Sequence, residues 1–337
     1  MEVLLGKTLE ELQEIAISVG LQKFAGKQLA QWLYVQRVNS IDEMTNISLK
    51  GREALKAHYT VGRHAPVREA VSVDGTRKYL FAVGEQFIES VYIPEEDRAT
   101  LCVSTQAGCK MGCKFCMTGT LGFHGQLSAA EILNQIFYFD DLSNLVYMGE
   151  GEPMDNIDNV LRSLEIMTAE YGCAWSPKRI TVSTVGVPAM KRFLDESECH
   201  LAISMHDPFP AERAQIMPAE KMMSISEVIA LLKQYDWTHQ RRVSFEYICW
   251  HGQNDSIRHA KELLRLLKGL NCRINLIRFH AGVEDIKNER RFPASDEKQM
   301  EWFRDYLTQN GLTTTIRRSR GEDILAACGM LVNSLTR

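Results

Sequence analysis

The sequence predicts an α/β protein, an open, partial barrel of parallel strands that follows a small helical domain. Strand-like and helix-like segments alternate after residue 106, which is typical of a parallel sheet with right-handed crossovers. The count of about six strand–helix units is too small for a closed barrel of eight. A chain of 337 residues with 45% hydrophobic residues can bury one large core beside a smaller appendage.

The first 64 residues are expected to form the helical domain. Leucine and isoleucine follow helical spacing over Leu5–Ile15, and Thr8-Leu-Glu-Glu11 is a capping box at the start of that helix. Apolar runs over 24–38 and 49–58 predict two more helices. The basic residues of this domain fit either an RNA-binding face or an ordinary solvated helix face. These residues are Lys23, Lys27, Arg37, Lys50, Arg52 and Lys56.

Residues 65–98 are expected to be a β-rich extension, and residues 99–337 the barrel with a C-terminal extension. β-type runs at 77–83 and 87–93 are joined by a turn-like segment. The barrel strands are expected at 99–105, 144–148, 179–184, 201–205, 242–249, 273–279 and 313–317. Loops after the carboxyl ends of parallel strands build the active sites of such folds, so residues in those loops are the first candidates for function.

The composition excludes several classes of protein. A net charge of −4 argues against a protein whose whole surface is basic and binds nucleic acid. Local basic patches are compatible with this net charge. No stretch reaches the roughly 18 apolar residues of a membrane span, and the N-terminal residues lack a signal-peptide pattern. The odd number of cysteines, 9, favours reduced thiols over a disulfide framework. We therefore expect a cytoplasmic protein with no membrane partner.

Three cysteines in one loop carry the strongest chemical signal. Cys109, Cys113 and Cys116 have the spacing C-x3-C-x2-C and follow the first barrel strand. Thiolates are ligands for zinc and for iron–sulfur clusters. A structural zinc site needs four ligands, and His124 is the nearest candidate for a fourth. A four-iron cluster held by three cysteines leaves one iron open for a substrate, and we expect metal ligands here in preference to three core cysteines.

Further motifs give the chain a specific family resemblance. The cysteine loop, with Phe115 inside it, resembles that of the radical S-adenosylmethionine (SAM) superfamily. Gly151-Glu-Pro153 follows the second barrel strand, and Ser204-Met-His206 follows the fourth. Ile324-Leu-Ala-Ala-Cys328-Gly lies near the C-terminus, and Cys102 precedes the first ligand by seven residues. Together these motifs resemble the RlmN/Cfr family of RNA adenine methyltransferases over nearly the whole chain.

The resemblance implies a radical route to a methylated adenine carbon. In the family, three cysteines hold a [4Fe-4S] cluster whose open iron binds SAM, and two SAM molecules are used per turnover. The first SAM methylates a cysteine, here Cys328, and the second yields a 5′-deoxyadenosyl radical that removes hydrogen from the S-methyl group. The carbon radical adds to adenine, Cys102 attacks the sulfur of Cys328 to release the product, and the transient disulfide must be reduced. Glu89 matches the proton acceptor of the family.

The resemblance also implies which residues contact SAM. They are Gly151, Glu152, Ser183, Ser204, Met205, His206 and His280. Three positions depart from the family pattern, because His280 replaces a usual Asn, Glu150 a usual Met, and Asp207 a common Ala or Ser. Pro153 favours the RlmN branch, which methylates carbon 2, and Arg278 is closer to the Cfr branch, which methylates carbon 8. Branch assignment therefore stays open at the level of sequence.

Single residues have simpler interpretations. Cys102 and Cys328 each fit a buried core residue, and Glu89 fits a solvent-facing strand residue. The joint pattern favours methylation of adenine carbon 2 in RNA, in 23S ribosomal RNA and also in tRNA. It implies an electron donor such as flavodoxin or ferredoxin and no DNA partner. The alternatives are carbon-8 methylation or another RNA target, as in the Cfr branch, and a non-catalytic, metal-stabilised RNA-binding protein.

RNA contacts are expected from local basic clusters, since the chain as a whole is acidic. Beyond the helical domain these clusters are Arg241-Arg242, Arg290-Arg291 and Arg317-Arg-Ser-Arg320. The last cluster lies beside Cys328, where guanidinium groups would neutralise phosphates near the reacting adenine.

Overall fold

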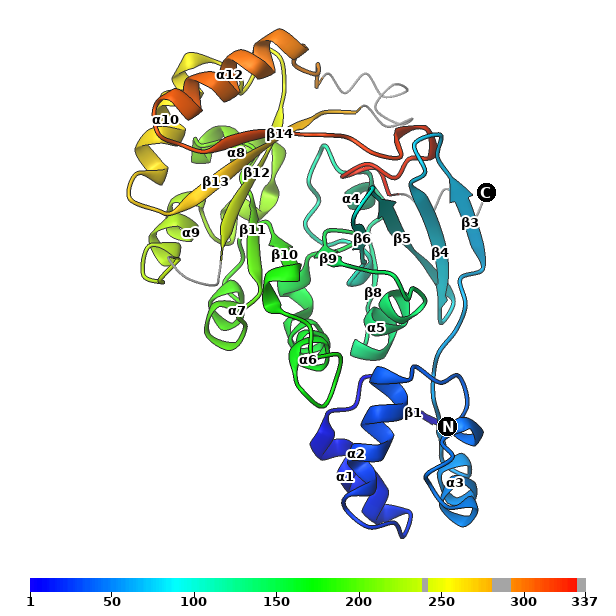
Figure 1. Cartoon of the computed structure of the whole chain (residues 1–337). Coiled ribbons are helices and arrows are strands. Elements are labelled where there is room, and N and C mark those ends of the chain that lie inside the picture. Colours follow the sequence, from blue (N-terminus) through cyan, green and yellow to red (C-terminus); the bar gives the residue numbers. More distant parts are fainter. Residues whose placement is uncertain (238–241, 281–291, 332–337) are drawn as a thin grey trace.

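The computed structural model describes residues 1–237, 242–280 and 292–331, and it joins a small helical domain to a large curved sheet (Figure 1). The helical domain contains α1 (Leu9–Ser18), α2 (Ala25–Ala30), the π-helical turn η1 (Gln31–Val35), η2 (Ile41–Glu43) and α3 (Leu49–Lys56), with β1 (Glu2–Val3) parallel to β2 (Tyr59–Thr60). The predicted capping box is present, because the Thr8 hydroxyl accepts from Glu11 N and the Glu11 carboxylate accepts from Thr8 N. The helix expected over 24–38 ends at Val35, since Arg37 has a left-handed φ of 54°.

A sheet of 10 strands forms the body of the molecule, in the order β14-β13-β12-β11-β10-β9-β6-β5-β4-β3. Its parallel strands are β6 (Ala99–Cys102), β9 (Asn144–Tyr147), β10 (Ile180–Thr184), β11 (His200–Ser204), β12 (Val243–Cys249), β13 (Cys272–Arg278) and β14 (Thr314–Arg317). The antiparallel strands are β3 (Arg68–Val71), β4 (Arg77–Val83) and β5 (Gln86–Pro94). Among the described residues β14 and β3 are edge strands, which confirms the predicted open barrel. The β-rich extension continues this sheet through β5, which pairs with β6.

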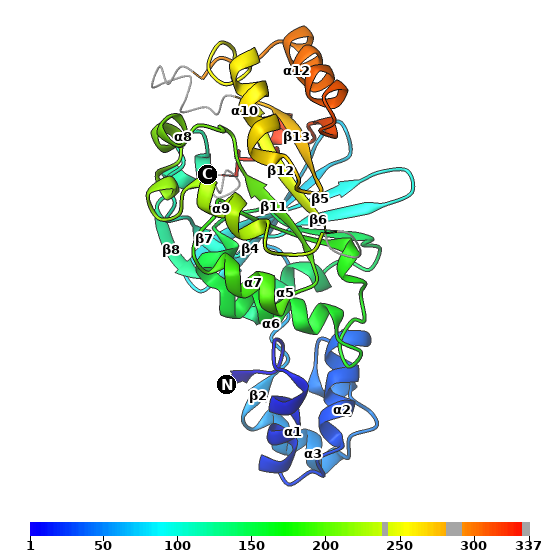
Figure 2. The same ribbon diagram turned by 90° about the vertical axis from the view of Figure 1, so that its left-hand side faces the viewer.

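Helices cover the outer face of the parallel strands (Figures 1 and 2). They are α5 (Ala129–Phe137), α6 (Ile157–Thr168), α7 (Met190–Glu196), α9 (Ile225–Leu232), α10 (Ile257–Leu267) and α12 (Glu297–Gln309). The alternation of side chains along a strand separates core from site. In β12, Val243, Phe245 and Tyr247 are buried toward the helices, and the Tyr247 ring stacks on Phe303 of α12 at 5.7 Å. The residues between them face the concave side of the sheet.

Short elements at the carboxyl ends of the strands shape the site. They are the hairpin β7 (Gln106–Gly108) and β8 (Phe123–Gln126), helices α4 (Met117–Thr120) and α8 (Pro210–Ile216), and the 3-10 turns η3 (Pro153–Asn156), η4 (Pro177–Arg179), η5 (Pro218–Lys221) and η6 (Glu322–Ile324). The helical domain lies at the other end of the molecule (Figure 2), where Arg162 of α6 donates to the Glu11 carboxylate at 2.7 Å. Within the described part of the chain, no helix has both the length and the apolar character needed to cross a membrane.

Candidate active site

The three clustered cysteines line one cavity of about 140 Å³ at the carboxyl ends of the strands. Cys109, Cys113 and Cys116 lie on the loop between β7 and α4, and their side chains are buried or half-buried. The loop requires glycine at Gly108, where φ is 71° and an added Cβ would lie 1.9 Å from Gly122 O.

The environment of these sulfurs fits a soft, cationic ligand. Burial raises the pKa of the Cys109 thiol to about 12 and also raises the pKa of the Cys113 and Cys116 thiols. A thiolate buried without a cation is costly, and metal binding removes that cost because it deprotonates the thiol. Three such groups facing one cavity therefore fit a cluster held by three thiolates. His124, the candidate fourth ligand, is exposed and bonds to Leu121 O at 3.0 Å.

The Gly-Glu-Pro loop forms a second wall of the same cavity. Gly151 has a φ of 94°, and an added Cβ would lie 2.5 Å from Gln106 Cβ, so only glycine fits there. The buried Glu152 carboxylate accepts from Met154 N at 3.0 Å and from Val185 N at 2.9 Å. Burial raises the pKa of Glu152 to about 7. Both residues line the cavity.

The carboxyl ends of β10 and β11 and the loops that follow them supply the third wall, with Ser183, Ser204 and His206 facing the cavity. His206 Nδ1 accepts from Ile248 N at 3.0 Å, and burial lowers its pKa to about 3, so the imidazole is neutral with its proton on Nε2. Met205 is fully buried in the core and is not among the described residues that line the cavity.

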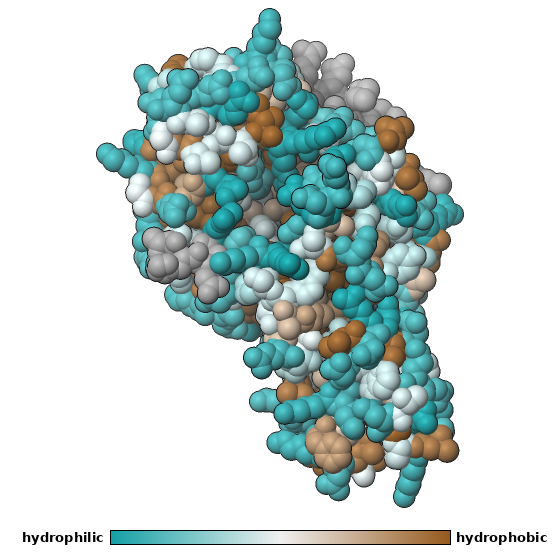
Figure 3. All heavy atoms as spheres, viewed as in Figure 1, coloured by the Kyte–Doolittle hydropathy of each residue, from teal (hydrophilic) through white to brown (hydrophobic). Residues whose placement is uncertain are grey.

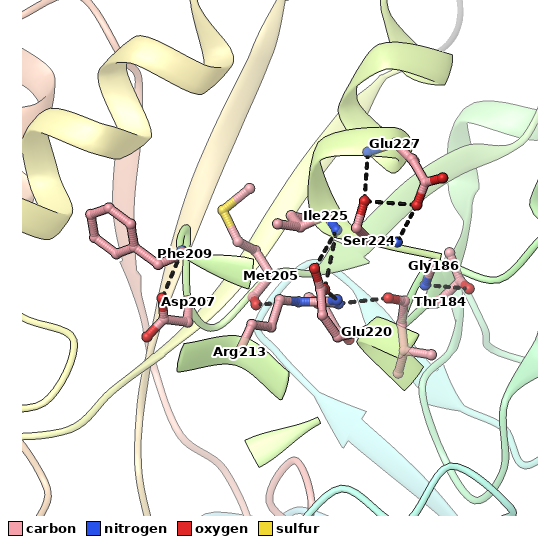
Figure 4. A network of polar contacts seen from close by, with 12 residues as sticks. Thr184, Gly186, Met205, Asp207, Phe209, Arg213, Glu220, Ser224, Ile225 and Glu227 are labelled. Carbon is pink, nitrogen blue, oxygen red and sulfur yellow. Dashed lines mark hydrogen bonds and ion pairs between the residues drawn. The ribbon is translucent and has the colours of Figure 1, made fainter. Parts of the chain in front are cut away.

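A buried arginine holds these loops together, and sequence reasoning missed it (Figure 4). Arg213 of α8 donates from Nε to Met205 O at 2.9 Å. Its Nη2 donates to Ser204 O at 2.8 Å and to Val185 O at 2.6 Å. Nη1 pairs with the buried carboxylate of Glu220, which in turn accepts from the backbone at the start of α9. An isolated arginine in a short helix gives no signal in the sequence, because its partners are backbone carbonyls on distant loops.

Cys102 and Cys328 line a smaller adjoining cavity of about 100 Å³. Cys102 is half-buried on β6, and Cys328 is exposed and also borders the cavity of the three clustered cysteines. Both are free thiols. Burial raises the pKa of Cys102 to about 12, and neighbouring Cys328 adds to that shift while Arg317 opposes it. The structure thus brings two cysteines that are distant in the sequence, one on β6 and one on the segment after η6, to one cavity.

Hydrogen bonds hold the segment that contains Cys328 against the barrel on both sides. Met117 N donates to Gly329 O at 2.8 Å, and the Thr118 hydroxyl donates to Leu331 O at 2.9 Å. On the other side Lys78 Nζ donates to Leu325 O at 3.3 Å. The first contact joins the Cys328 segment directly to the helix that follows Cys116.

Glu89 is fully buried on β5, where it forms an ion pair with the equally buried Lys78 at 3.1 Å. The interpretation of Glu89 as a solvent-facing strand residue is therefore wrong. Glu89 is not among the described residues that line either cavity. Its backbone N donates at 2.8 Å to the buried carboxylate of Glu150, which also accepts from Gly108 N at 3.3 Å. Burial raises the pKa of Glu150 to about 8.

The other two departures, His280 and Asp207, are not among the described residues that line either cavity, and neither is Arg278. His280 Nε2 contacts Ser319 Oγ at 2.7 Å, and Arg278 pairs with Glu297 of α12. Asp207 is buried behind the site, where His259 and Glu212 lie close to it. Arg258 forms an ion pair with Glu212 of this group at 2.6 Å.

The predicted RNA contacts divide into described and undescribed residues. Arg241, Arg290 and Arg291 lie outside the described residues. In the helical domain, Arg37 donates to Phe139 O at 2.7 Å and Lys56 pairs with Asp42 at 2.7 Å, so these two have intramolecular roles.

Comparison with known proteins relates the chain to one family over nearly its whole length. Residues 103–267 match the model of the radical SAM superfamily, and residues 3–61 match that of the ribosomal RNA large subunit methyltransferase N-terminal domain. A probable dual-specificity RNA methyltransferase RlmN of Phocaeicola vulgatus is 60% identical, with 97% of this chain and 94% of the relative covered. The dual-specificity RNA methyltransferase RlmN of Oleidesulfovibrio alaskensis is 38% identical, with coverages of 97% and 95%. The crystal structure of a radical SAM methyltransferase from Sphaerobacter thermophilus superimposes with a TM-score of 0.90 at 36% identity, covering 98% of this chain and 99% of that one.

Proposed function

The chain belongs to the RlmN family of radical SAM RNA methyltransferases, and we propose on this premise that it methylates carbon 2 of adenine in RNA through a methylated cysteine. The substrates we propose are an adenine of 23S ribosomal RNA and, as a second target, an adenine of tRNA. One observation carries the proposal. Three candidate cluster ligands, the Gly-Glu-Pro loop and Cys328 all line a single cavity.

The cavity divides into a cluster end and a SAM end. Cys109, Cys113 and Cys116 would hold the [4Fe-4S] cluster, which when bound supplies the electron for reductive cleavage of SAM. Such radical chemistry is needed because an aromatic adenine carbon is a poor nucleophile. Flavodoxin or ferredoxin is the electron donor that we propose.

The chain's own side chains would orient SAM. The Glu152 carboxylate faces the cavity as a hydrogen-bond acceptor, which suits the amino group of SAM. The neutral His206 ring offers an N–H donor, and the hydroxyls of Ser183 and Ser204 can both donate and accept. Met205 would contribute through its backbone alone, since its side chain is in the core. His280 would reach SAM only after leaving its contact with Ser319.

The two cysteines of the smaller cavity have separate tasks in this proposal. Cys328 accepts a methyl group from the first SAM because its sulfur is exposed and borders the cofactor cavity. Cys102 then bonds to that sulfur, the bond from the sulfur to the transferred carbon breaks, and an outside reductant restores both thiols. Lys78 of the buried Lys78–Glu89 pair contacts the Cys328 segment at Leu325 O, and Glu89 is the proton acceptor that we propose, acting after movement of that segment.

Mass spectrometry of nucleosides tests the proposal. Cluster-loaded protein is incubated without oxygen with SAM, a reductant and ribosomal RNA or tRNA that lacks the modification. The proposal predicts 2-methyladenosine in the digested RNA. If only 8-methyladenosine appears, the result favours the alternative of carbon-8 methylation. If no methylated adenosine appears, the result favours the alternative of a non-catalytic, metal-stabilised RNA-binding protein.

A further inference from the structure

The concave face of the sheet contains a third cavity that no step of the proposed methylation uses. It has a volume of about 260 Å³ and is lined by strands from β9 to β14. The pleat explains its polarity, because every second residue of β12 and β13 points inward. Ser244 and Glu246 of β12 are in register with Arg273 and Asn275 of β13, and all four line the cavity. In the space-filling view this face of the molecule is hollowed over the sheet, with hydrophilic residues around the hollow (Figure 3).

Two arginines of this cavity have no acidic partner among the described residues. Arg242, just before β12, is exposed, and Arg273 of β13 is half-buried. Within residues 1–237, 242–280 and 292–331 neither guanidinium forms an ion pair. Arginines on the outer helices differ, since Arg265 pairs with Glu262 at 2.6 Å and Arg304 with Asp305 at 2.7 Å. Two such guanidinium groups at one cavity favour an anionic ligand.

The cavity also contains a buried carboxylate whose second oxygen has only a long ion pair. Glu246 is 4% exposed, and its Oε1 accepts from Ser244 Oγ at 3.1 Å and from Asn275 Nδ2 at 2.8 Å. Its Oε2 has no hydrogen-bond partner among the described residues and lies 3.5 Å from Arg317 Nη1. The ion pair with Arg317 is too long for a good hydrogen bond, so Oε2 can still accept from a ligand that brings a hydroxyl or amino group. The ligand is therefore expected to carry both an anion and a hydrogen-bond donor.

The position of this cavity connects it to the reacting cysteines. Arg317 and Met148 line this cavity, the cofactor cavity and the smaller cavity of Cys102 and Cys328. Glu246 lines both this cavity and the cofactor cavity. A chain that enters past the exposed Arg242 and runs along the strands therefore arrives next to Cys328. A small free anion would satisfy the arginines but would not extend from Arg242 to Glu246.

We propose that this cavity binds the RNA backbone beside the target adenine, with Arg242 and Arg273 on phosphates and Glu246 accepting from a ribose 2′-hydroxyl. The inference rests on the proposed function and deepens it, because it places the RNA strand that leads to Cys328. Guanidinium groups recognise phosphate oxygens through paired N–H donors, and the 2′-hydroxyl distinguishes RNA from DNA. The arginine pair supplies affinity, and Glu246 supplies the preference for RNA.

Binding measurements with matched variants test the binding of phosphates. The R242Q/R273Q double variant is compared with R265Q/R304Q, which removes the same charge from the outer helices. The probe is a fluorescent synthetic RNA hairpin with an unpaired adenine in its loop, and anisotropy is measured over a range of salt concentrations. We expect the Kd of R242Q/R273Q to rise roughly tenfold, and the slope of log Kd against log salt to fall by about 0.7 for each phosphate that the variant no longer binds. The control keeps the wild-type values.

Glu246 has its own measurement in the same assay. The ratio of the Kd for a DNA hairpin to that for the RNA hairpin should fall severalfold in E246Q, because the amide removes one acceptor for the 2′-hydroxyl. An unchanged ratio would overturn the role of Glu246.

The outcomes separate this inference from the proposed function. Wild-type protein that yields no methylated adenosine contradicts the function. The RNA cavity alone is contradicted by a combination of two results. The wild-type protein methylates RNA, and R242Q/R273Q has the same Kd and salt slope as R265Q/R304Q. A raised Kd with an unchanged slope also contradicts the binding of phosphates by these arginines. If the double variant does not reach the wild-type unfolding midpoint, R242Q alone gives the same test, since Arg242 is exposed.

Discussion

At the scale of single residues, exposure separates two thiols that share a cavity. Cys328 is exposed on the segment that follows η6, and Cys102 is half-buried on β6. A methyl acceptor must be reached by SAM, whereas a resolving thiol must be kept from reacting first. Burial raises the pKa of Cys102 to about 12, which keeps it protonated and unreactive at neutral pH. This difference supports the order that we propose, with Cys328 as the methyl acceptor and Cys102 as the resolving thiol.

Substitution of each cysteine should therefore block a different step. Cys328→Ala should carry no methyl group and form no link to RNA, because the methyl acceptor is missing. Cys102→Ala should accumulate RNA attached to the protein, since nothing breaks the bond from Cys328 to the adenine. Denaturing gels and intact-protein mass spectrometry measure both species. Cys272→Ala, which removes a half-buried thiol that lines none of the three cavities, is the control. A Cys102→Ala preparation without attached RNA would contradict the resolving role.

The neutral His206 ring gives a second prediction at this scale, in the pH dependence of stability. Its folded pKa of about 3 lies below the ordinary value of 6.5, so the unfolded chain takes up the proton first as pH falls. His206 should thus lower the free energy of unfolding between pH 6.5 and 3 by roughly 1.4 kcal/mol per pH unit. Denaturant titrations at pH 7 and pH 5 should show a larger loss for the wild type than for His206→Gln. Equal losses would show that His206 does not titrate as a buried neutral group.

At the scale of elements, the strand-end loops of β10 and β11 depend on one ion pair. Arg213 and Glu220 are both buried, and the arginine donates to three backbone carbonyls of these loops. Arg213→Met leaves the Glu220 carboxylate buried without its partner, which should lower the free energy of unfolding by roughly 3–5 kcal/mol. Because Ser204 ends β11 and His206 lies on the loop after it, SAM affinity should fall as well. Chemical denaturation and equilibrium dialysis with SAM measure the two effects.

An exposed ion pair provides the control for Arg213. Arg192 pairs with Glu196 on the surface of α7, so Arg192→Met should change neither stability nor SAM affinity appreciably. If Arg213→Met behaves like Arg192→Met in both measurements, the loops do not depend on the buried pair.

The elements also show what sequence patterns can predict. The open barrel follows from the alternation of strand and helix patterns, and the cysteine spacing identifies the cofactor loop, because both signals are local. Arg213 and the full burial of Glu89 were not predictable, since they depend on which distant strands and loops meet. The RNA cavity is an intermediate case. Arg242 stood out as half of a basic pair, but its neighbour Arg273 is brought close only by the register of β12 and β13.

At the scale of the whole molecule, three cavities meet at Arg317. The first is lined by the clustered cysteines, the second by Cys102 and Cys328, and the third by Arg242 and Arg273. The open edge of the sheet gives a long RNA strand access that a closed barrel would deny. The fold thus brings the cysteine loop, Cys102 with Cys328, and the cavity that we propose for RNA to one place, although their residues are distributed over most of the chain.

The central claim is that the loop of Cys109, Cys113 and Cys116 holds a cluster at which SAM is split. The most direct test is to measure 5′-deoxyadenosine by mass spectrometry after oxygen-free reconstitution with iron and sulfide and incubation with SAM, dithionite and RNA. Wild type and Cys272→Ala should form 5′-deoxyadenosine, and Cys113→Ala should form none. Wild-type protein that forms no 5′-deoxyadenosine, or Cys113→Ala that forms as much as the wild type, would contradict the claim.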